Sequence, residues 1–329
     1  MGASDLSKGA PQGELGMIFL TDAQVAELAD LPELTVKLRQ AFQTPAVIPA
    51  RTQYEAPGSK LLVMPAWGEG PNLGLKVVTV ADRARPHGGP NVNGIYLLLD
   101  RETGDVRAVL EAASLTALRT ACVSALAASA LAPPASRSML MIGTGFLAPH
   151  LIRAHLQACR LERVYVWGRS AAKAKALVQE IIEPGVLVEA VDDIEDVIGQ
   201  VDIVCAATAS RLPLIRAAQP RLGAYLALIG SFTPEMREAD VEIIGQSRVV
   251  VDIRDALEEA GELVDAARAG RLSKVETLGE VLGKPDKHTG SHCFTVFKSV
   301  GAALADLVMA EAIVAAAMRR SDGRFVIGL

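Results

Sequence analysis

The segment 138–148, which reads SMLMIGTGFLA, constrains the fold of this 329-residue chain more than any other. An apolar run at 139–142 leads directly into Gly143, and the pattern G-x-G-x-x-A ends at Ala148, where a helical pattern begins. In a strand–turn–helix unit the first glycine permits the tight turn, Gly145 lets backbone approach a pyrophosphate, and Ala148 lets helix and strand pack closely. The free N–H groups of the helix N-terminus attract phosphate. The segment predicts a dinucleotide site, with a glycine-rich turn that binds nothing as the alternative.

The end of the next predicted strand, 163–167, indicates which dinucleotide binds. Proteins selective for NAD usually place an acidic residue here, where it accepts a hydrogen bond from the ribose 2′-hydroxyl. This chain has Gly168, Arg169 and Ser170, followed by Lys173. A guanidinium, a hydroxyl and a helix N-terminus can together bind a 2′-phosphate. We therefore expect NADPH, with NADH as a weaker cofactor; the alternative is a solvated arginine beside a serine N-cap.

The order of predicted elements indicates two domains. From residue 138 strands at 185–190, 203–206, 224–229 and 249–251 alternate with helices, which predicts a doubly wound parallel sheet. Before it, a capping box at 21–24 and a helix at 32–41 precede short strands at 60–64, 73–80, 94–100 and 106–110 and an Ala-rich helix at 112–131. A long apolar helix is predicted over 295–319. The expected fold class is α/β, with a Rossmann domain (133–299) inserted into an α+β substrate domain (17–132 plus 300–329), and 1–16 disordered.

Composition excludes several classes of function. Half of the residues are hydrophobic and the net charge is −5, so the composition does not indicate the excess of basic residues that nucleic-acid binding requires. The most apolar window, 121–132, is too short to span a membrane, and no secretory signal is recognisable. The four scattered cysteines indicate reduced, buried thiols and a cytoplasmic protein.

Basic residues on apolar elements are the candidates for substrate binding. Arg51 begins the strand region, Lys76 lies within an apolar strand, and Arg119 interrupts an apolar helix. One such residue usually snorkels or pairs with a carboxylate. Three in one domain, beside a nucleotide fold, suit an anionic substrate. We expect Arg83 and Arg85 to be loop charges, and we propose no metal site from His150, His155, His288 and His292.

The motifs G-L-K-V-V-T (74–79), L-T-A-L-R-T-A (115–121), W-G-R-S (167–170) and T-V-F-K-S (295–299) resemble those of the ornithine cyclodeaminase/μ-crystallin family through most of the chain. The resemblance implies a homodimer with a substrate and dimerisation domain and a Rossmann domain. It implies that Arg51, Lys76 and Arg119 hold a substrate carboxylate. The cofactor residues it implies are Gly143, Thr144, Gly145, Phe146, Leu147, Arg169, Ser170, Lys173, Thr208 and Ile229.

Two departures from the cyclodeaminases direct the expected reaction. Where those enzymes have an aspartate for the substrate amino group, this chain has Phe232, and Arg169 replaces their acidic residue for NAD. The resemblance then favours the ketimine reductases, which reduce Δ1-pyrroline-2-carboxylate or Δ1-piperideine-2-carboxylate to L-proline or L-pipecolate. In this hypothesis Arg51 and Arg119 fix the carboxylate, Lys76 donates a proton or orients the substrate, and Phe232 forms an apolar wall. The alternatives are an alanine- or opine-type dehydrogenase, a non-catalytic NADPH-dependent binding protein, and an ornithine cyclodeaminase.

Overall fold

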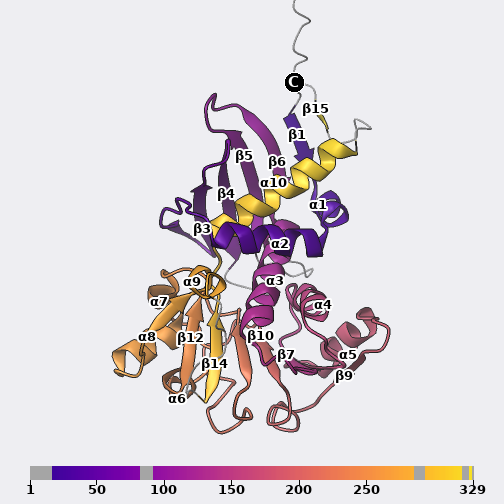
Figure 1. The fold of residues 1–329 in the computed structure, drawn as a ribbon, viewed down its shortest axis with the longest axis vertical. Coiled ribbons are helices and arrows are strands. Elements are labelled where there is room, and N and C mark those ends of the chain that lie inside the picture. Colours follow the sequence, from indigo (N-terminus) through magenta and orange to yellow (C-terminus); the bar gives the residue numbers. More distant parts are fainter. Residues whose placement is uncertain (1–16, 82–91, 285–292, 321–325, 328–329) are drawn as a thin grey trace, which may run out of the picture.

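The computed structural model describes residues 17–81, 92–284, 293–320 and 326–327. Its strands form two sheets, one above the other in the view of Figure 1, and the long helix α3 (Ala112–Leu131) runs between them. The segment 1–16 expected to be disordered, Arg83, Arg85, His288 and His292 lie outside the described residues.

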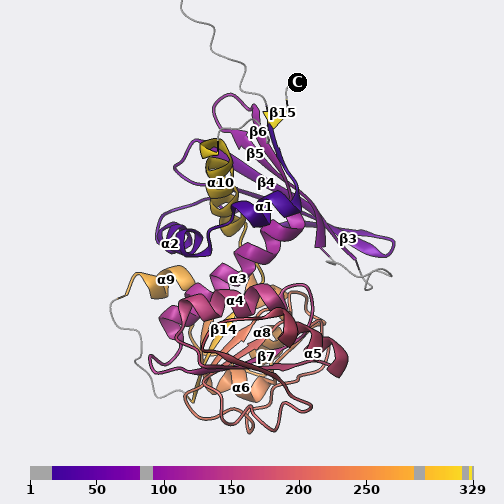
Figure 2. The same cartoon turned by 90° about the vertical axis from the view of Figure 1, so that its right-hand side faces the viewer.

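The first sheet comes from the N-terminal part of the chain and a C-terminal strand. Its strands are β1 (Met17–Leu20), β2 (Thr52–Ala56), β3 (Ser59–Trp67), β4 (Asn72–Ala81), β5 (Val92–Asp100), β6 (Val106–Glu111) and β15 (Val326–Ile327), in the order β15-β1-β6-β5-β4-β3-β2. Strands β2 to β6 pair antiparallel, as the short strands and turns predicted. The helices α1 (Asp22–Leu28), α2 (Leu31–Phe42) and α10 (Ala303–Arg319) lie on the same side of this sheet as α3 (Figure 2).

The second sheet is entirely parallel and confirms the predicted Rossmann architecture. It contains β7 (Ser138–Ile142), β8 (Arg163–Trp167), β9 (Leu187–Ala190), β10 (Ile203–Ala206), β11 (Tyr225–Leu228), β12 (Ser247–Val251), β13 (Val275–Thr277) and β14 (Phe294–Lys298), in the order β13-β12-β14-β11-β10-β7-β8-β9. The helices described between β7 and β14 are α4 (Ala148–Ala158), α5 (Ala171–Glu180), α6 (Val241–Gly245), α7 (Ala256–Glu259), α8 (Gly261–Arg268) and α9 (Leu278–Leu282). The strand order reverses between β7 and β10, where such sheets bind ligands at the carboxyl ends of their strands.

Helix α3 is the core element that joins the two sheets. Its 20 residues are apolar enough to cross a membrane, but 89% of its most apolar window is buried within the protein. It packs on helix α4, on β11 and β14 of the second sheet, and on β5 and β6 of the first sheet. A helix that is hydrophobic all round suits such a fully buried position.

The predicted helix over 295–319 was wrong in its first part. Residues Phe294–Lys298 form β14, a central strand hydrogen-bonded to β11 and β12, and the helix α10 begins only at Ala303. Short apolar runs do not distinguish a buried strand from a buried helix, and the residues T-V-F favour the strand by their shape. The correction places the segment 299–302 at the carboxyl edge of the parallel sheet, next to the first domain.

Candidate active site

A buried cluster of charges joins the first sheet to helices α3 and α10. Lys76 of β4 is 1% exposed and Arg119 of α3 is 7% exposed. Both contact Asp306, in the first turn of α10: Lys76 Nζ lies 2.7 Å from Oδ2, and Arg119 Nε lies 3.0 Å from Oδ1. The alternative considered from sequence, pairing with a carboxylate, is therefore observed, and the same carboxylate brings the two cations together.

Asp306 orients the two cations and leaves part of each available. The Nε edge of Arg119 is occupied, while Nη1 and Nη2 have no hydrogen-bond partner among the described residues. Burial lowers the pKa of Lys76 to about 8, and the nearby Arg119 and Arg51 act in the same direction, whereas Asp306 opposes them. The result is a lysine that is mostly protonated at neutral pH and can lose its proton at modest cost.

Arg51 reaches across to the second domain. It donates through Nε to Glu259 Oε1 (2.7 Å), through Nη2 to the other oxygen of the same carboxylate, and through Nη2 to the carbonyl of Val300 (3.1 Å). Its charge also acts on Lys76, whose pKa it lowers. Arg51 is thus connected to the cluster through the segment 299–302 rather than through Asp306.

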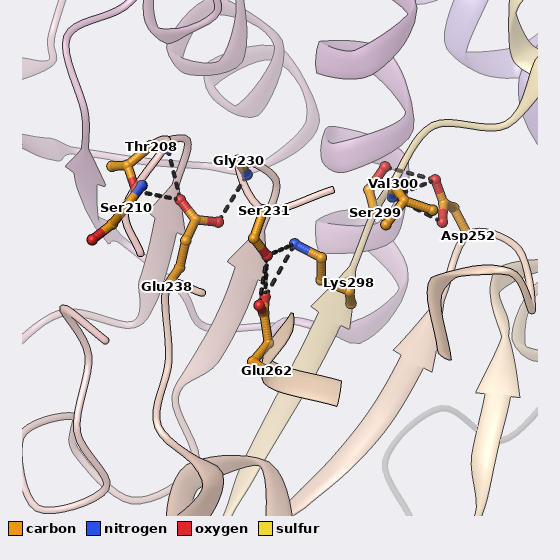
Figure 3. A network of polar contacts seen from close by, with 10 residues as sticks. All are labelled: Thr208, Ser210, Gly230, Ser231, Glu238, Asp252, Glu262, Lys298, Ser299 and Val300. Carbon is orange, nitrogen blue, oxygen red and sulfur yellow. Dashed lines mark hydrogen bonds and ion pairs between the residues drawn. The ribbon is translucent and has the colours of Figure 1, made fainter. Parts of the chain in front are cut away.

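The backbone segment 299–302 contacts both Arg51 and Arg119. Asp252, directly after β12, accepts hydrogen bonds from Ser299 Oγ (2.7 Å) and from the backbone N–H of Val300 (3.1 Å) (Figure 3). It also accepts one from the backbone N–H of Gly301 (2.7 Å). Gly301 has φ +95°, and a Cβ there would lie 2.8 Å from Arg119 Nη1. Only glycine leaves room for this guanidinium beside the backbone. The carboxyl edge of the parallel sheet therefore adjoins the basic cluster.

The glycine turn lies at the same edge of the parallel sheet. Gly143 has φ +120°, and a Cβ there would meet the carbonyl of Ala207 at 2.6 Å and Thr208 Cγ2 at 3.3 Å. Around the Cβ position of Gly145 no atom lies within 4 Å, so this backbone is open to a ligand. Helix α4 begins at Ala148 without a side-chain cap; the N–H of Ala148 donates to the carbonyl of Gly145 (3.0 Å) and Pro149 has no N–H. The backbone N–H groups of residues 144–147, in the turn itself, donate to no described residue and remain for a ligand.

The other residues of this turn have distinct environments. Thr144 packs against the Cα of Gly168 at the end of β8, where a Cβ would lie 2.7 Å from Thr144 Cγ2. The ring of Phe146 is 39% exposed and lies 5.5 Å from that of His150. Leu147 occupies the N-cap position of α4. Phosphate binding at this turn would rest on backbone rather than on side chains.

The residues after β8 are open to solvent. Arg169 and Lys173 are exposed, and Arg169 makes no ion pair with any described residue. Ser170 is the N-cap of α5, where its Oγ accepts from the N–H of Lys173 at 3.4 Å. The serine thus has the structural role considered as the alternative, and its place at a helix N-terminus is also compatible with a phosphate.

A buried glutamate that we did not predict from the sequence joins the ends of β10 and β11. Glu238 accepts from Thr208 N–H (2.6 Å) and Oγ1 (2.9 Å) and from Gly230 N–H (2.8 Å) (Figure 3). Burial raises its pKa, although these backbone donors act against the shift. Thr208 and the buried Ile229 are therefore held at this edge by a carboxylate from a later loop.

A second buried ion pair lies under the following residues. Lys298, at the end of β14, lies 3.1 Å from Glu262 Oε1 and donates to Ser231 Oγ at 2.6 Å, and Ser231 also contacts Glu262 (Figure 3). Phe232 follows, half-buried against the apolar core of the second sheet. The structure thus joins Lys76 and Arg119 through Asp306, and it connects Arg51 to them through the segment 299–302. Phe232 packs instead on the core of the second sheet, and Arg169 is exposed.

The histidines and cysteines contribute packing. His155 is fully buried, and burial lowers its pKa to about 4. Cys122 and Cys205 are buried as expected, whereas Cys159 and Cys293 are half-buried; all four are free thiols. In the part of the chain that the structure describes, no three His, Cys, Asp or Glu side chains are grouped to hold a metal ion.

Comparison with known proteins agrees with this architecture. The model of the ornithine cyclodeaminase/mu-crystallin family matches residues 17–321. A Δ(1)-pyrroline-2-carboxylate reductase of Colwellia psychrerythraea is 32% identical over 312 residues, which cover 91% of this chain and 98% of that protein.

Two solved structures are similar over almost the whole chain. The Δ(1)-pyrroline-2-carboxylate reductase of Thermococcus litoralis, in complex with NADH and L-proline, has a TM-score of 0.89 and 26% identity, covering 95% of this chain and 100% of that one. An archaeal alanine dehydrogenase dimer with bound NAD has a TM-score of 0.86 and 25% identity, covering 95% and 99%. On the match over residues 17–321 and the shared fold, this chain belongs to the ornithine cyclodeaminase/mu-crystallin family.

Proposed function

We propose that this protein reduces a cyclic 2-imino acid, Δ1-pyrroline-2-carboxylate or Δ1-piperideine-2-carboxylate, with a reduced nicotinamide nucleotide. The observation that carries the proposal is the buried Lys76–Asp306–Arg119 cluster, which adjoins the edge that bears the glycine turn. The likeness to pyrroline-2-carboxylate reductases in sequence and structure supports the same substrate class.

The basic cluster would bind the substrate through its carboxylate. Arg119 offers Nη1 and Nη2, the fork that matches a carboxylate, and Arg51, which donates to the carbonyl of the neighbouring Val300, would add its charge. Because Asp306 fixes the guanidinium of Arg119, little side-chain entropy is lost when the carboxylate binds. Phe232 would form an apolar wall at the carboxyl edge, in place of the polar residue of the cyclodeaminases.

The reaction needs a hydride at C2 and a proton at the imine nitrogen. The bound nicotinamide would supply the hydride, and the electron pair of the C=N π bond would move to nitrogen. We propose that Lys76 supplies the proton, because its pKa of about 8 lets it donate near neutral pH. Asp306, which contacts Lys76 Nζ, would hold the ammonium in position.

The residues of the turn fit a dinucleotide, and the loop after β8 favours NADPH. The open backbone at Gly145 and the uncapped start of α4 suit a pyrophosphate. The exposed Arg169, with Ser170 at the start of α5 and Lys173 nearby, would meet the 2′-phosphate. The two similar solved structures contain NADH and NAD, so NADH remains the competing cofactor to measure.

An assay of cofactor oxidation tests the function. Purified protein would be given NADPH or NADH with each cyclic imine or with pyruvate plus ammonia. In a separate arm ornithine would be given with NAD⁺, because release of ammonia through an imine begins with oxidation of the amine. We expect oxidation of the cofactor with the cyclic imines. Turnover only with pyruvate plus ammonia would replace the proposal by an alanine dehydrogenase, which the second solved structure favours. Ammonia release from ornithine would indicate a cyclodeaminase, and tight cofactor binding without turnover a binding protein.

We also propose that the protein is a homodimer formed through the first sheet. The face of this sheet away from the helices carries half-buried apolar side chains from three adjacent strands: Leu61 and Val63 of β3, Leu75 and Val77 of β4, and Leu97 of β5. A contiguous apolar face of this kind marks an interaction surface. Sedimentation equilibrium should give the mass of two chains; a monomer at micromolar concentration would overturn this assignment.

A further inference from the structure

Among the charged side chains that form ion pairs at the proposed substrate site, cations outnumber carboxylates by one. Lys76 and Arg119 share the single carboxylate of Asp306, and Arg51 has the carboxylate of Glu259 to itself. Three cations therefore face two carboxylates. One further carboxylate, that of the substrate, would neutralise these three cations. Asp252 forms no ion pair with them and accepts hydrogen bonds from Ser299, Val300 and Gly301 instead.

Of the two carboxylates that pair with these cations, Glu259 belongs to the second domain and Asp306 to the first. Glu259 lies at the end of α7 and binds Arg51 through both carboxylate oxygens. Its side chain remains 24% exposed, whereas that of Asp306 is fully buried. Burial raises the pKa of Glu259, and so do the like charges of Asp255 and Asp252, while Arg51 lowers it. Negative charge is thus concentrated on this side of Arg51.

We propose that Glu259 restricts the enzyme to imino acids with a single carboxylate. The inference rests on the proposed function. With Glu259 present, the first substrate carboxylate balances the one cation in excess, so a second carboxylate would add uncompensated negative charge to a site that already holds Glu259 and the like charges of Asp252 and Asp255. Like charges brought together in a partly desolvated site disfavour binding strongly, which is how charged residues exclude wrong ligands. Glu259 acts here through Arg51 and is a specificity-determining residue, not a catalytic one.

Two matched substrates and two matched variants test this role. Δ1-Piperideine-2,6-dicarboxylate differs from Δ1-piperideine-2-carboxylate by one carboxylate. Glu259→Gln removes the charge but keeps the size and one acceptor for Arg51. Glu258→Gln, its exposed neighbour, makes the same charge change without contacting Arg51. The readout is the ratio of kcat/KM for the monocarboxylate to that for the dicarboxylate.

We expect Glu259→Gln to lower this ratio ~10-fold or more, and Glu258→Gln to change it less than ~2-fold. Glu259→Asp, which keeps the charge, should stay near the wild-type ratio. An unchanged ratio in Glu259→Gln, or an equal fall in both glutamine variants, would overturn the proposal. If Glu259→Gln does not fold, Glu259→Ala gives the same test of charge removal. A wild type that reduces neither imine would instead refute the proposed function, so the two failures are distinguishable.

Discussion

The nucleotide turn and the basic cluster adjoin the same edge of the parallel sheet but are built differently. The turn consists of backbone: Gly143 at φ +120°, the open Gly145 and the uncapped start of α4. The cluster consists of buried charged side chains from three elements, held by Asp306. One site is made within a single strand–turn–helix unit, and the other exists only when the whole chain has folded.

This difference predicts different responses to mutation. A protein with buried charged side chains stays folded only while each charge has its partner, because an uncompensated charge inside a protein lowers the free energy of unfolding strongly. Backbone sites tolerate changes of nearby exposed side chains, which alter what binds rather than whether the protein folds.

Asp306→Asn should have the largest effect. It leaves Arg119 and Lys76 without their shared counter-charge, and the guanidinium cannot lose its proton. We expect the free energy of unfolding in urea to fall by ~3–5 kcal/mol, together with loss of activity. Glu311→Gln, on the same helix but in contact with Asn72 instead, is the control and should cost less. Equal stability of Asp306→Asn and wild type would contradict a cluster held by this carboxylate.

The same difference explains what the sequence could predict. The G-x-G-x-x-A turn, the strands around it and the helix α3 are local patterns, and each was predicted from neighbouring residues. The basic residues were found because cations on apolar elements are unusual. Their partners were not: Asp306 lies 230 residues from Lys76, and Glu259 lies 208 from Arg51.

An acidic residue inside the apolar helix α10 was a usable but incomplete signal for a buried partner. Such a position indicates that a carboxylate needs a counter-charge, which our sequence predictions did not include, and only the fold determines which cation it meets. The misassigned β14 had a related cause, since its position between β11 and β12 depends on long-range pairing. Glu238 was missed for the same reason, because its donors lie on two other loops.

Arg119→Lys separates the charge of the cluster from its geometry. Lysine can keep an ion pair with Asp306 but lacks the planar fork for a carboxylate. We expect kcat/KM for the imine to fall ~10–100-fold, mainly through KM, because charge-assisted hydrogen bonds to the substrate are lost. Arg39→Lys, on α2, should leave both constants unchanged. A fall in kcat alone would mean that Arg119 acts on the reacting atoms instead.

The pH dependence of activity tests the role of Lys76. Its pKa of about 8 lies below that of an exposed lysine because burial disfavours the ammonium. If the protonated form is required, kcat/KM should be constant below this pKa and fall as the pH rises through about 8. Lys76→Arg, which stays charged but cannot give up its proton, should lower kcat/KM over the whole pH range and lose this alkaline limb, and the same substrate in both proteins controls for titration of the imine. An identical limb in the variant would assign it to another group.

Arg169→Asp should have the smallest effect and act on cofactor choice alone. The side chain is exposed and unpaired with any described residue, so its loss should not change the free energy of unfolding. A carboxylate there would repel a 2′-phosphate and could accept a hydrogen bond from a 2′-hydroxyl. We expect KM for NADPH to rise ~10-fold or more while that for NADH changes less than ~3-fold. Lys175→Asp makes the same charge change further along α5 and should discriminate far less. An equal loss for both cofactors would remove Arg169 from the 2′-phosphate site and leave NADPH preference without a structural cause in this loop.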